Sequence, residues 1–228
     1  MESFRKADMQ AEKMLGNFMD HNFYSKLHDK NGDLIDYERL VDKESQLQGI
    51  DVKINVDGRT LLIDEKASFY YSNAMIPTFA FEIDSIQKNR LVDGWFINDS
   101  LLTEYYMLIW PNVKCQKDGD NWLRKNISEI KESDFTIIEA MLVEKKKLLA
   151  EVAKHGFPVS RLKSYANEMR SRIDNGNARA EETLDDDIRM VYSGFLAEKP
   201  VNAVIQKRLL KQIASAIYLI SEDGYARI

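Results

Sequence analysis

The chain has 228 residues, 44% of them hydrophobic and 30% charged, a mixture that excludes a disordered polypeptide. Its formal net charge of −5 excludes a broadly basic, histone-like DNA binder. The single cysteine, Cys115, excludes an intramolecular disulfide and a multi-cysteine zinc site, and no apolar run is long enough to span a membrane. We therefore expect a cytoplasmic protein that does not associate with membranes.

The first half of the chain predicts a helix followed by several strands. Apolar residues at helical spacing predict a helix over 4–20, and a short strand is expected over 23–27. Two alternating apolar runs predict a β-hairpin over 49–68. Further strands are predicted at 79–84, 94–98 and 104–110, the last apolar throughout as in a buried central strand.

The second half predicts more helix. A long helix is expected over 134–155, with Lys145–Lys147 on its solvated face, and a second helix over about 159–173. The remaining elements are a mobile loop over 174–187, strands over 188–192 and 201–205, and a final helix over 206–220. The predicted fold class is α+β (mixed α/β), with a core over 1–133 and a helix-rich extension over 134–228 packed on it, as two units or as one domain.

The hairpin carries the most informative pattern in the chain. Asp57-Gly58 suits a two-residue type I′ turn, which would pair Val56 with Arg59. Counting back from that turn brings Asp51 opposite Asp64. Because side chains alternate between the faces of a strand, Asp51, Asp64 and Lys66 should then project from one face.

Two carboxylates and an ammonium on one face of an apolar hairpin predict a metal site. Mg²⁺ prefers oxygen ligands, and its charge relieves the repulsion between Asp51 and Asp64. The backbone carbonyl of Glu65 can add a third ligand. Lys66 can position or help deprotonate an attacking water, or stabilise charge on a phosphorane, as phosphodiester hydrolysis requires.

These residues carry a resemblance to a known family. Gly49-Ile50-Asp51 followed by Ile63-Asp64-Glu65-Lys66 resembles the signature of the PD-(D/E)xK nuclease superfamily, which includes restriction endonucleases and Holliday-junction resolvases. The acid here follows Gly-Ile where the family has Pro, and the second acid is Asp where Glu is commoner. Glu12, on the predicted first helix, resembles the helical glutamate that completes the metal site in resolvase-like members. The resemblance covers about residues 8–110.

The resemblance implies both a fold and an activity. It implies a restriction endonuclease-like core sheet flanked by helices, here with a C-terminal helical and β-hairpin elaboration. It also implies a Mg²⁺-dependent deoxyribonuclease, with Mn²⁺ as a substitute, that leaves a 5′-phosphate on DNA in restriction, repair, recombination or a phage or other mobile element. Residues 134–228 would then supply DNA contacts or a dimer interface, since a two-fold dimer matches the cutting of both strands.

Several assignments stay open on the residues alone. Glu44 competes with Glu12 as the third acid, and Glu82 could touch the site through water. Substrate contacts could come from residues that precede the hairpin or lie on the second predicted helix, namely Gln48, Arg161, Lys163, Arg170 and Arg172.

Each assignment also has a plain structural alternative. The two aspartates could be exposed edge-strand charges, Lys66 a simple partner of Asp64, and the basic residues a solvated helix face. A non-catalytic DNA-binding or assembly module that keeps the nuclease fold is the alternative function. An unrelated α+β domain in which the aspartates do not face each other is a third possibility.

Overall fold

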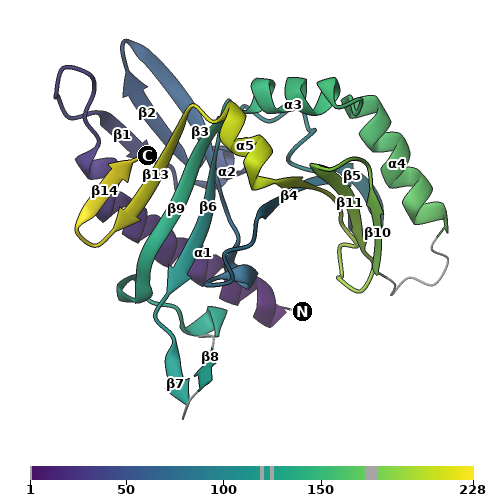
Figure 1. Ribbon diagram of the computed structural model, residues 1–228, viewed down its shortest axis with the longest axis horizontal. Helices are drawn as coiled ribbons and strands as arrows, with labels where there is room; N and C mark the ends of the chain where they lie inside the picture. Colours follow the sequence, from purple (N-terminus) through teal and green to yellow (C-terminus); the bar gives the residue numbers. More distant parts are fainter. Residues whose placement is uncertain (1, 119–120, 124–125, 173–178) are drawn as a thin grey trace.

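The computed structural model describes residues 2–118, 121–123, 126–172 and 179–228. Within these residues the strands form a seven-stranded sheet, a five-stranded sheet and a two-stranded ribbon (Figure 1). In spatial order, the large sheet consists of β1 (Asp36–Arg39), β2 (Val52–Val56), β3 (Arg59–Ala67), β6 (Tyr105–Val113), β9 (Phe135–Glu144), β13 (Ala216–Ser221) and β14 (Gly224–Arg227). Only the β3–β6 pair is parallel among the pairs described in this sheet.

The smaller sheet is antiparallel throughout its described pairs. Its spatial order is β10 (Arg179–Thr183), β11 (Ile188–Ser193), β12 (Val201–Gln206), β4 (Thr78–Gln87) and β5 (Arg90–Asp93). The ribbon pairs β7 (Gln116–Asp118) with β8 (Asn121–Leu123). Helices and strands therefore build an α+β fold, as the sequence predicts.

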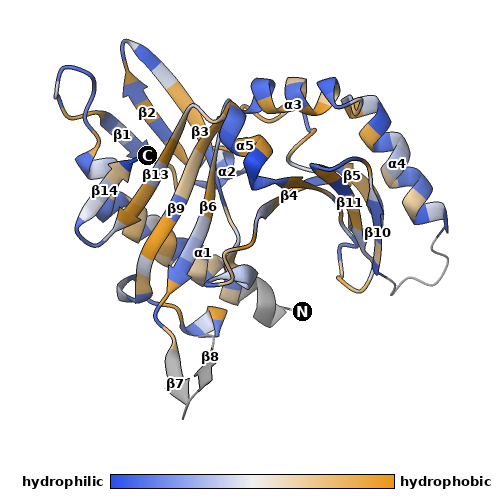
Figure 2. Ribbon diagram, in the orientation of Figure 1, coloured by the Kyte–Doolittle hydropathy of each residue, from blue (hydrophilic) through white to orange (hydrophobic). Residues whose placement is uncertain are grey.

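The helices cover the sheets on different sides. They are α1 (Glu2–Asn22), α2 (Lys43–Leu47), α3 (Lys145–Lys154), α4 (Val159–Arg172) and α5 (Lys207–Ile213). Helix α1 lies across one face of the large sheet, whereas α3, α4 and α5 gather with the smaller sheet on the other side (Figure 1). In the large sheet β9 and β13 are mostly hydrophobic and the edge strand β1 is hydrophilic, whereas α3 and α4 carry both kinds of residue (Figure 2). No helix in the described ranges combines the length and hydropathy that crossing a membrane would need.

Strand β6 joins two hydrophobic cores. Tyr106 and Leu108 point into the core shared with β4, α3, α4 and the smaller sheet. Met107 and Ile109 point into the core beneath α1. All four side chains are at most 1% exposed, so the prediction of a central strand buried on both faces is confirmed.

Several predicted helices and strands were wrong. The expected helix over 134–155 is strand β9 followed by α3, because the apolar run in Phe135–Glu144 pairs with β6 on one side and with β13 on the other. The expected helix over 206–220 is α5 followed by β13.

Other errors are local. Residues 23–27 contain a 3₁₀ turn at Tyr24–Lys26, and 94–98 form a turn after β5. The predicted loop over 174–187 contains β10, while its residues 174–178 lie outside the described part.

The chain does not divide at residue 133. The large sheet takes β9, β13 and β14 from beyond that point, and the smaller sheet takes β4 and β5 from before it. Both sheets are therefore built jointly by the two halves. The C-terminal part is not an extension packed on a finished core, because it supplies strands to that core.

Candidate active site

The hairpin forms in the predicted register. β2 and β3 pair antiparallel from Val56 opposite Arg59 to Val52 opposite Ile63. The turn residues have positive φ angles, +51° at Asp57 and +73° at Gly58, as a type I′ turn requires. The pairing continues one residue beyond β2, because the Asp51 N–H donates a 2.9 Å hydrogen bond to the Ile63 carbonyl.

Asp51 and Asp64 consequently meet at the end of the hairpin farthest from its turn. Asp64 is only 2% exposed. Asp51 Oδ2 accepts a 2.8 Å hydrogen bond from the Glu65 N–H. Burial and the neighbouring Asp64 carboxylate raise the pKa of Asp51 to about 6. The two acids are therefore a close pair and not separate edge-strand charges.

One oxygen of this pair has no partner. Asp64 Oδ1 forms an ion pair with the Lys66 ammonium, whereas Asp64 Oδ2 is buried and accepts no hydrogen bond from the described residues. A buried carboxylate oxygen without a partner costs free energy, and a cation is one way to recover it.

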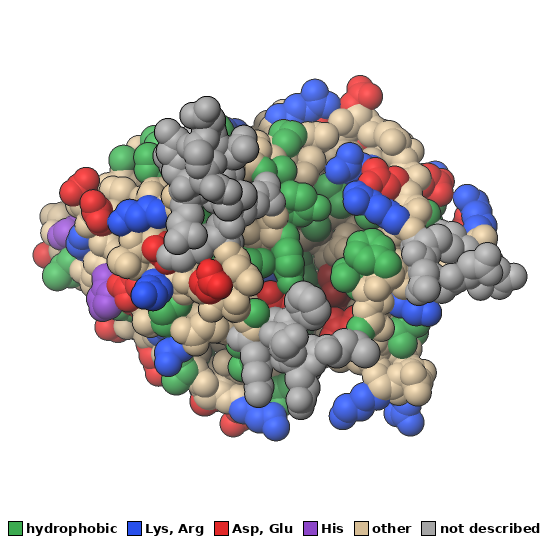
Figure 3. All heavy atoms as spheres, turned by 90° about the horizontal axis from the view of Figure 1, so that it is seen from below, with side chains coloured by type: hydrophobic (Ala, Val, Ile, Leu, Met, Phe, Trp, Pro, Cys, Tyr) green, Lys and Arg blue, Asp and Glu red, His purple; other side chains and the backbone are tan. Residues whose placement is uncertain are grey.

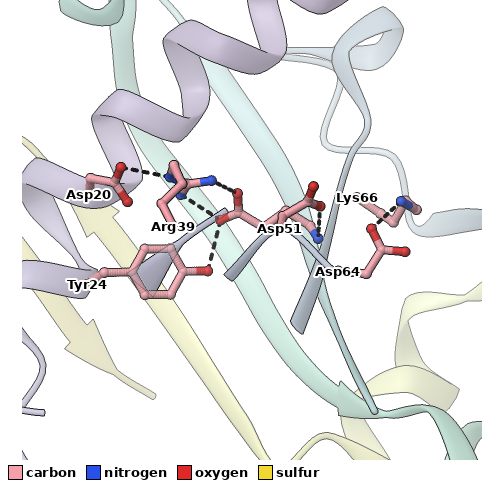
Figure 4. Close-up of polar contacts among 7 residues, drawn as sticks. Asp20, Tyr24, Arg39, Asp51, Asp64 and Lys66 are labelled. Atoms are coloured by element: carbon pink, nitrogen blue, oxygen red, sulfur yellow. Dashed lines mark hydrogen bonds and ion pairs between the residues drawn. The ribbon is translucent and has the colours of Figure 1, made fainter. Parts of the chain in front are cut away.

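Lys66 lies on the same face as both aspartates, as the strand alternation predicts (Figure 4). Its ammonium also stands 5.3 Å from the centre of the Trp95 ring. Burial acts to lower the pKa of Lys66, but Asp64 and Asp51 outweigh it and raise the pKa above its ordinary value. Lys66 is therefore a cation held against the acidic pair.

Glu12 approaches the same cluster from α1. Glu12 is an exposed residue as a whole, but its carboxyl group is partly removed from water, and this desolvation is the main cause that raises its pKa. The charge of Lys66 lowers that pKa and the charge of Asp51 raises it, so all three groups lie within electrostatic reach. Glu44 is exposed on α2 and is not among the charges that shift Asp51, Lys66 or Glu12. Of the two candidates for the third acid, the geometry favours Glu12.

Sequence reasoning missed Lys145, which it assigned to a solvated helix face. Lys145 is 7% exposed at the first position of α3, and its ammonium donates a 2.8 Å hydrogen bond to the Asn98 carbonyl. Burial lowers its pKa, while the charges of Asp64 and Asp99 act to raise it. The sequence could not reveal this position of Lys145. It depends on the pairing of β9 with β6, which is itself paired with the strand that carries Asp64.

Glu82 is a second ionisable group within electrostatic reach of Lys66. It lies on β4, where burial is the main cause that raises its pKa and the charge of Lys66 lowers it. Its carboxylate accepts a 3.2 Å hydrogen bond from Ser85. Gln48 is half-buried after α2, and its carbonyl accepts a hydrogen bond from Leu102.

The four basic residues proposed to contact substrate all have partners within the chain. Arg170 forms an ion pair with Asp84 and lies over Tyr192. The other three contact the Phe157 and Tyr165 rings (Arg161), Asp93 (Lys163), and Glu168 and Glu182 (Arg172). None of the four shifts the pKa of Asp51, Lys66 or Glu12, so the structure does not bring them to the acidic pair.

Seen from below, the molecule is hollowed between the large and small sheets. Acidic side chains lie in the floor of this hollow and hydrophobic side chains along its walls (Figure 3). A separate open cavity of about 540 Å³ lies against the C-terminal half of α1. It is lined by residues that include Met14, Phe18 and Glu132 and shares none with the acidic pair.

No family model, curated protein or solved structure matched this chain in the comparisons made with each. The likeness to PD-(D/E)xK nucleases therefore rests on the hairpin residues themselves.

The donors around Asp64 suit a hard divalent cation. The donors are the carboxylate oxygens of Asp64 and Asp51. Asp64 Oδ2 is buried without a hydrogen-bond partner among the described residues, and burial and the Asp64 charge raise the pKa of Asp51. No described group of three or more His, Cys, Asp or Glu side chains is gathered closely enough to hold a metal ion. A metal at this position would take carboxylate oxygens directly from Asp51 and Asp64 and complete its shell with a peptide carbonyl and with water, through which Glu12 would act.

Proposed function

We propose that the protein is a metal-dependent nuclease that hydrolyses phosphodiester bonds in DNA at the Asp51–Asp64 pair. The observation that carries the proposal is the partnerless Oδ2 of Asp64, buried beside a second carboxylate and followed two residues later by a cationic lysine. This combination leaves the pair short of positive charge. Mg²⁺ or Mn²⁺ would supply that charge.

Asp51, Asp64 and the Glu65 carbonyl would hold the metal, and Glu12 would assist from α1. When bound, the metal supplies Lewis acidity and a water of lowered pKa. Hydrolysis joins the water oxygen to phosphorus and breaks one phosphorus–ester bond, after which the leaving oxygen takes up a proton. The residues of the chain have the task of orienting these groups.

Lys66 has a narrower role than the sequence allowed. The acidic pair raises its pKa, which favours the protonated ammonium over a base that accepts a proton from water. An ammonium can hold the attacking water by its lone pair or stabilise negative charge on the phosphorane. We assign Lys66 this electrostatic role.

DNA as the substrate comes from the family resemblance, since the acidic pair itself specifies only a phosphodiester. Plasmid, linear duplex, single-stranded DNA and RNA should be incubated with the protein and Mg²⁺ or Mn²⁺. Asp64→Asn and Lys66→Ala should each reduce cleavage by at least about 100-fold. Lys30→Ala is the matched control, because Lys30 is an exposed lysine paired with Asp57 at the hairpin turn.

Two results would overturn the proposal. Equal cleavage by wild type and both site variants would identify a contaminating nuclease. DNA binding without any metal-stimulated cleavage would favour the non-catalytic module.

A further inference from the structure

A half-buried ionic network lies on the opposite face of β3, directly behind the acidic pair. Arg39 of β1 donates from Nε to Asp20 Oδ2 at 2.7 Å and from Nη1 to Glu65 Oε2 at 2.7 Å (Figure 4). The Tyr24 hydroxyl donates to Glu65 Oε1 at 2.8 Å. Three groups from α1, the following 3₁₀ turn and β1 therefore converge on one strand.

The network connects to the candidate site through a single peptide unit. Glu65 stands between Asp64 and Lys66, so its side chain points to α1 while theirs point the other way. Its N–H donates to Asp51 Oδ2 at 2.8 Å, and its carbonyl is the third ligand that the family resemblance implies. Fixing the Glu65 side chain thus fixes a backbone donor to one metal ligand and the carbonyl that would be another.

We propose that Arg39 and Tyr24 are positioning residues of the metal site, which act by holding Glu65 in place. This inference rests on the proposed function, because it names the residues that orient the same site. Both side chains contact Glu65, and neither would contact a metal held by Asp51 and Asp64 on the other face of β3. Their effect passes through the Glu65 peptide to Asp51.

Stability alone is a weak reason for such a network. Two carboxylates share one guanidinium, and Asp20 Oδ1 is buried without a hydrogen-bond partner among the described residues. Buried ion pairs seldom stabilise a fold more than apolar residues of the same volume would. A network that is largely removed from water and short of positive charge is better explained by the geometry that it imposes.

The surroundings of Arg39 are shaped to hold its guanidinium. A Cβ at Gly16 would stand 3.3 Å from the Arg39 guanidinium carbon, so the glycine in the middle of α1 leaves room for it. On its other side the guanidinium lies 5.6 Å from the centre of the Tyr24 ring, which stacks on Tyr37 at 5.5 Å. A lysine could replace the charge but could not reach Asp20 and Glu65 together.

Metal affinity is the measurement that separates positioning from stability. Mn²⁺ binding to the full chain should be measured by calorimetry for wild type, Arg39→Lys and Tyr24→Phe. Groups that orient metal ligands typically change affinity by about 10- to 100-fold when removed, so Arg39→Lys should weaken binding by about tenfold or more. Tyr24→Phe keeps the ring and should weaken binding by a smaller factor, about threefold.

Arg170→Lys is the matched control. Arg170 is 15% exposed against 19% for Arg39, pairs with the buried Asp84 and lies over the Tyr192 ring at 5.4 Å. Its substitution should destabilise the fold in a similar way and leave Mn²⁺ affinity unchanged.

Each result has one meaning. Weaker binding in Arg39→Lys or Tyr24→Phe, with normal binding in Arg170→Lys, supports the inference. Wild-type affinity in both, or an equal loss in Arg170→Lys, overturns it while the proposed function stands. Absence of Mn²⁺ binding by the wild type would overturn the proposed function and the inference together. If Arg39→Lys does not fold, Tyr24→Phe decides.

Discussion

Asp64 forms an ion pair with the Lys66 ammonium through Oδ1, while its Oδ2 is buried and has no hydrogen-bond partner among the described residues. The carboxyl of Asp51 adds further negative charge beside this ion pair, and burial and the Asp64 carboxylate raise the pKa of Asp51. The consequences can be measured in stability as well as in activity.

Replacing Asp51 with asparagine should stabilise the metal-free protein. Asparagine removes the repulsion from Asp64, and its side-chain oxygen can still accept the hydrogen bond from the Glu65 N–H. We expect the free energy of unfolding at neutral pH to rise by about 1–2 kcal/mol, while metal-dependent cleavage is lost. Urea denaturation in EDTA measures the first effect.

Asp57→Asn provides the control for this substitution. Asp57 is an exposed turn residue at φ +51°, a conformation that asparagine also tolerates. Its stability should change by less than about 0.5 kcal/mol. A loss of stability in Asp51→Asn would show that repulsion from Asp64 does not destabilise the folded protein.

The stability of the metal-free protein should increase on mild acidification. The pKa of Asp51 is about 6 in the folded state, against an ordinary value of 3.8. Between these values the folded state binds more protons than the unfolded state, so the free energy of unfolding rises as pH falls toward 5. The contribution of Asp51 is up to about 3 kcal/mol.

Urea midpoints measured between about pH 7 and pH 5 test this sign, with Asp51→Asn as the comparison. The free energy of unfolding of the variant should depend less steeply on pH, while the raised pKa values of Glu12 and Glu82 leave it some dependence. A wild-type midpoint that falls steadily over this interval would contradict the prediction.

Lys145 should be more important for stability than its position in a run of lysines indicates. Lys145→Ala would leave the Asn98 carbonyl without its 2.8 Å donor and remove a cation from the surroundings of Asp64. We expect a loss of about 1–3 kcal/mol in the free energy of unfolding. Lys146→Ala, at an exposed position on the same helix, should change it by less than about 0.5 kcal/mol. Similar free energies of unfolding for the two variants would show that Lys145 contributes no more to stability than an exposed lysine on the same helix.

Gly94 is expected to tolerate no side chain. A Cβ there would stand 2.3 Å from the Glu82 carbonyl oxygen, and the Phe96 N–H donates to that same oxygen. Gly94→Ala must therefore displace β4 at Glu82, whose carboxylate responds to Lys66. We expect a loss of more than about 2 kcal/mol, measured by urea denaturation, and a midpoint equal to that of the wild type would contradict it.

The hairpin could be read from the sequence because its information is local. Asp57-Gly58 fixes the turn, the turn fixes the register, and the register brings Asp51 to Asp64. Glu12 could be proposed as a site residue only from the family resemblance, since its approach to Lys66 depends on how α1 crosses the sheet.

The errors fall where distant pairing decides. The run Thr136–Val143 contains helix-forming residues, but a place between β6 and β13 overrides that preference and carries Lys145 to the site. The role of Arg39 was not predicted from the sequence. Its partners, Asp20 and Glu65, lie 19 and 26 residues away, and residues 35–47 form only short elements with no clear pattern.

The position of β9 between β6 and β13 has a consequence for synthesis. β6 is made before β9 and α3, so the edge that β9 covers and the face that α3 and the smaller sheet cover have no partners until residues beyond 134 have been made. The smaller sheet is complete only when β12 has been made, and the large sheet only when β14 has been made. The nascent chain therefore contains a strand that is buried on both faces in the folded protein before its partners have been made, and we expect its yield to depend on chaperones that shield such segments.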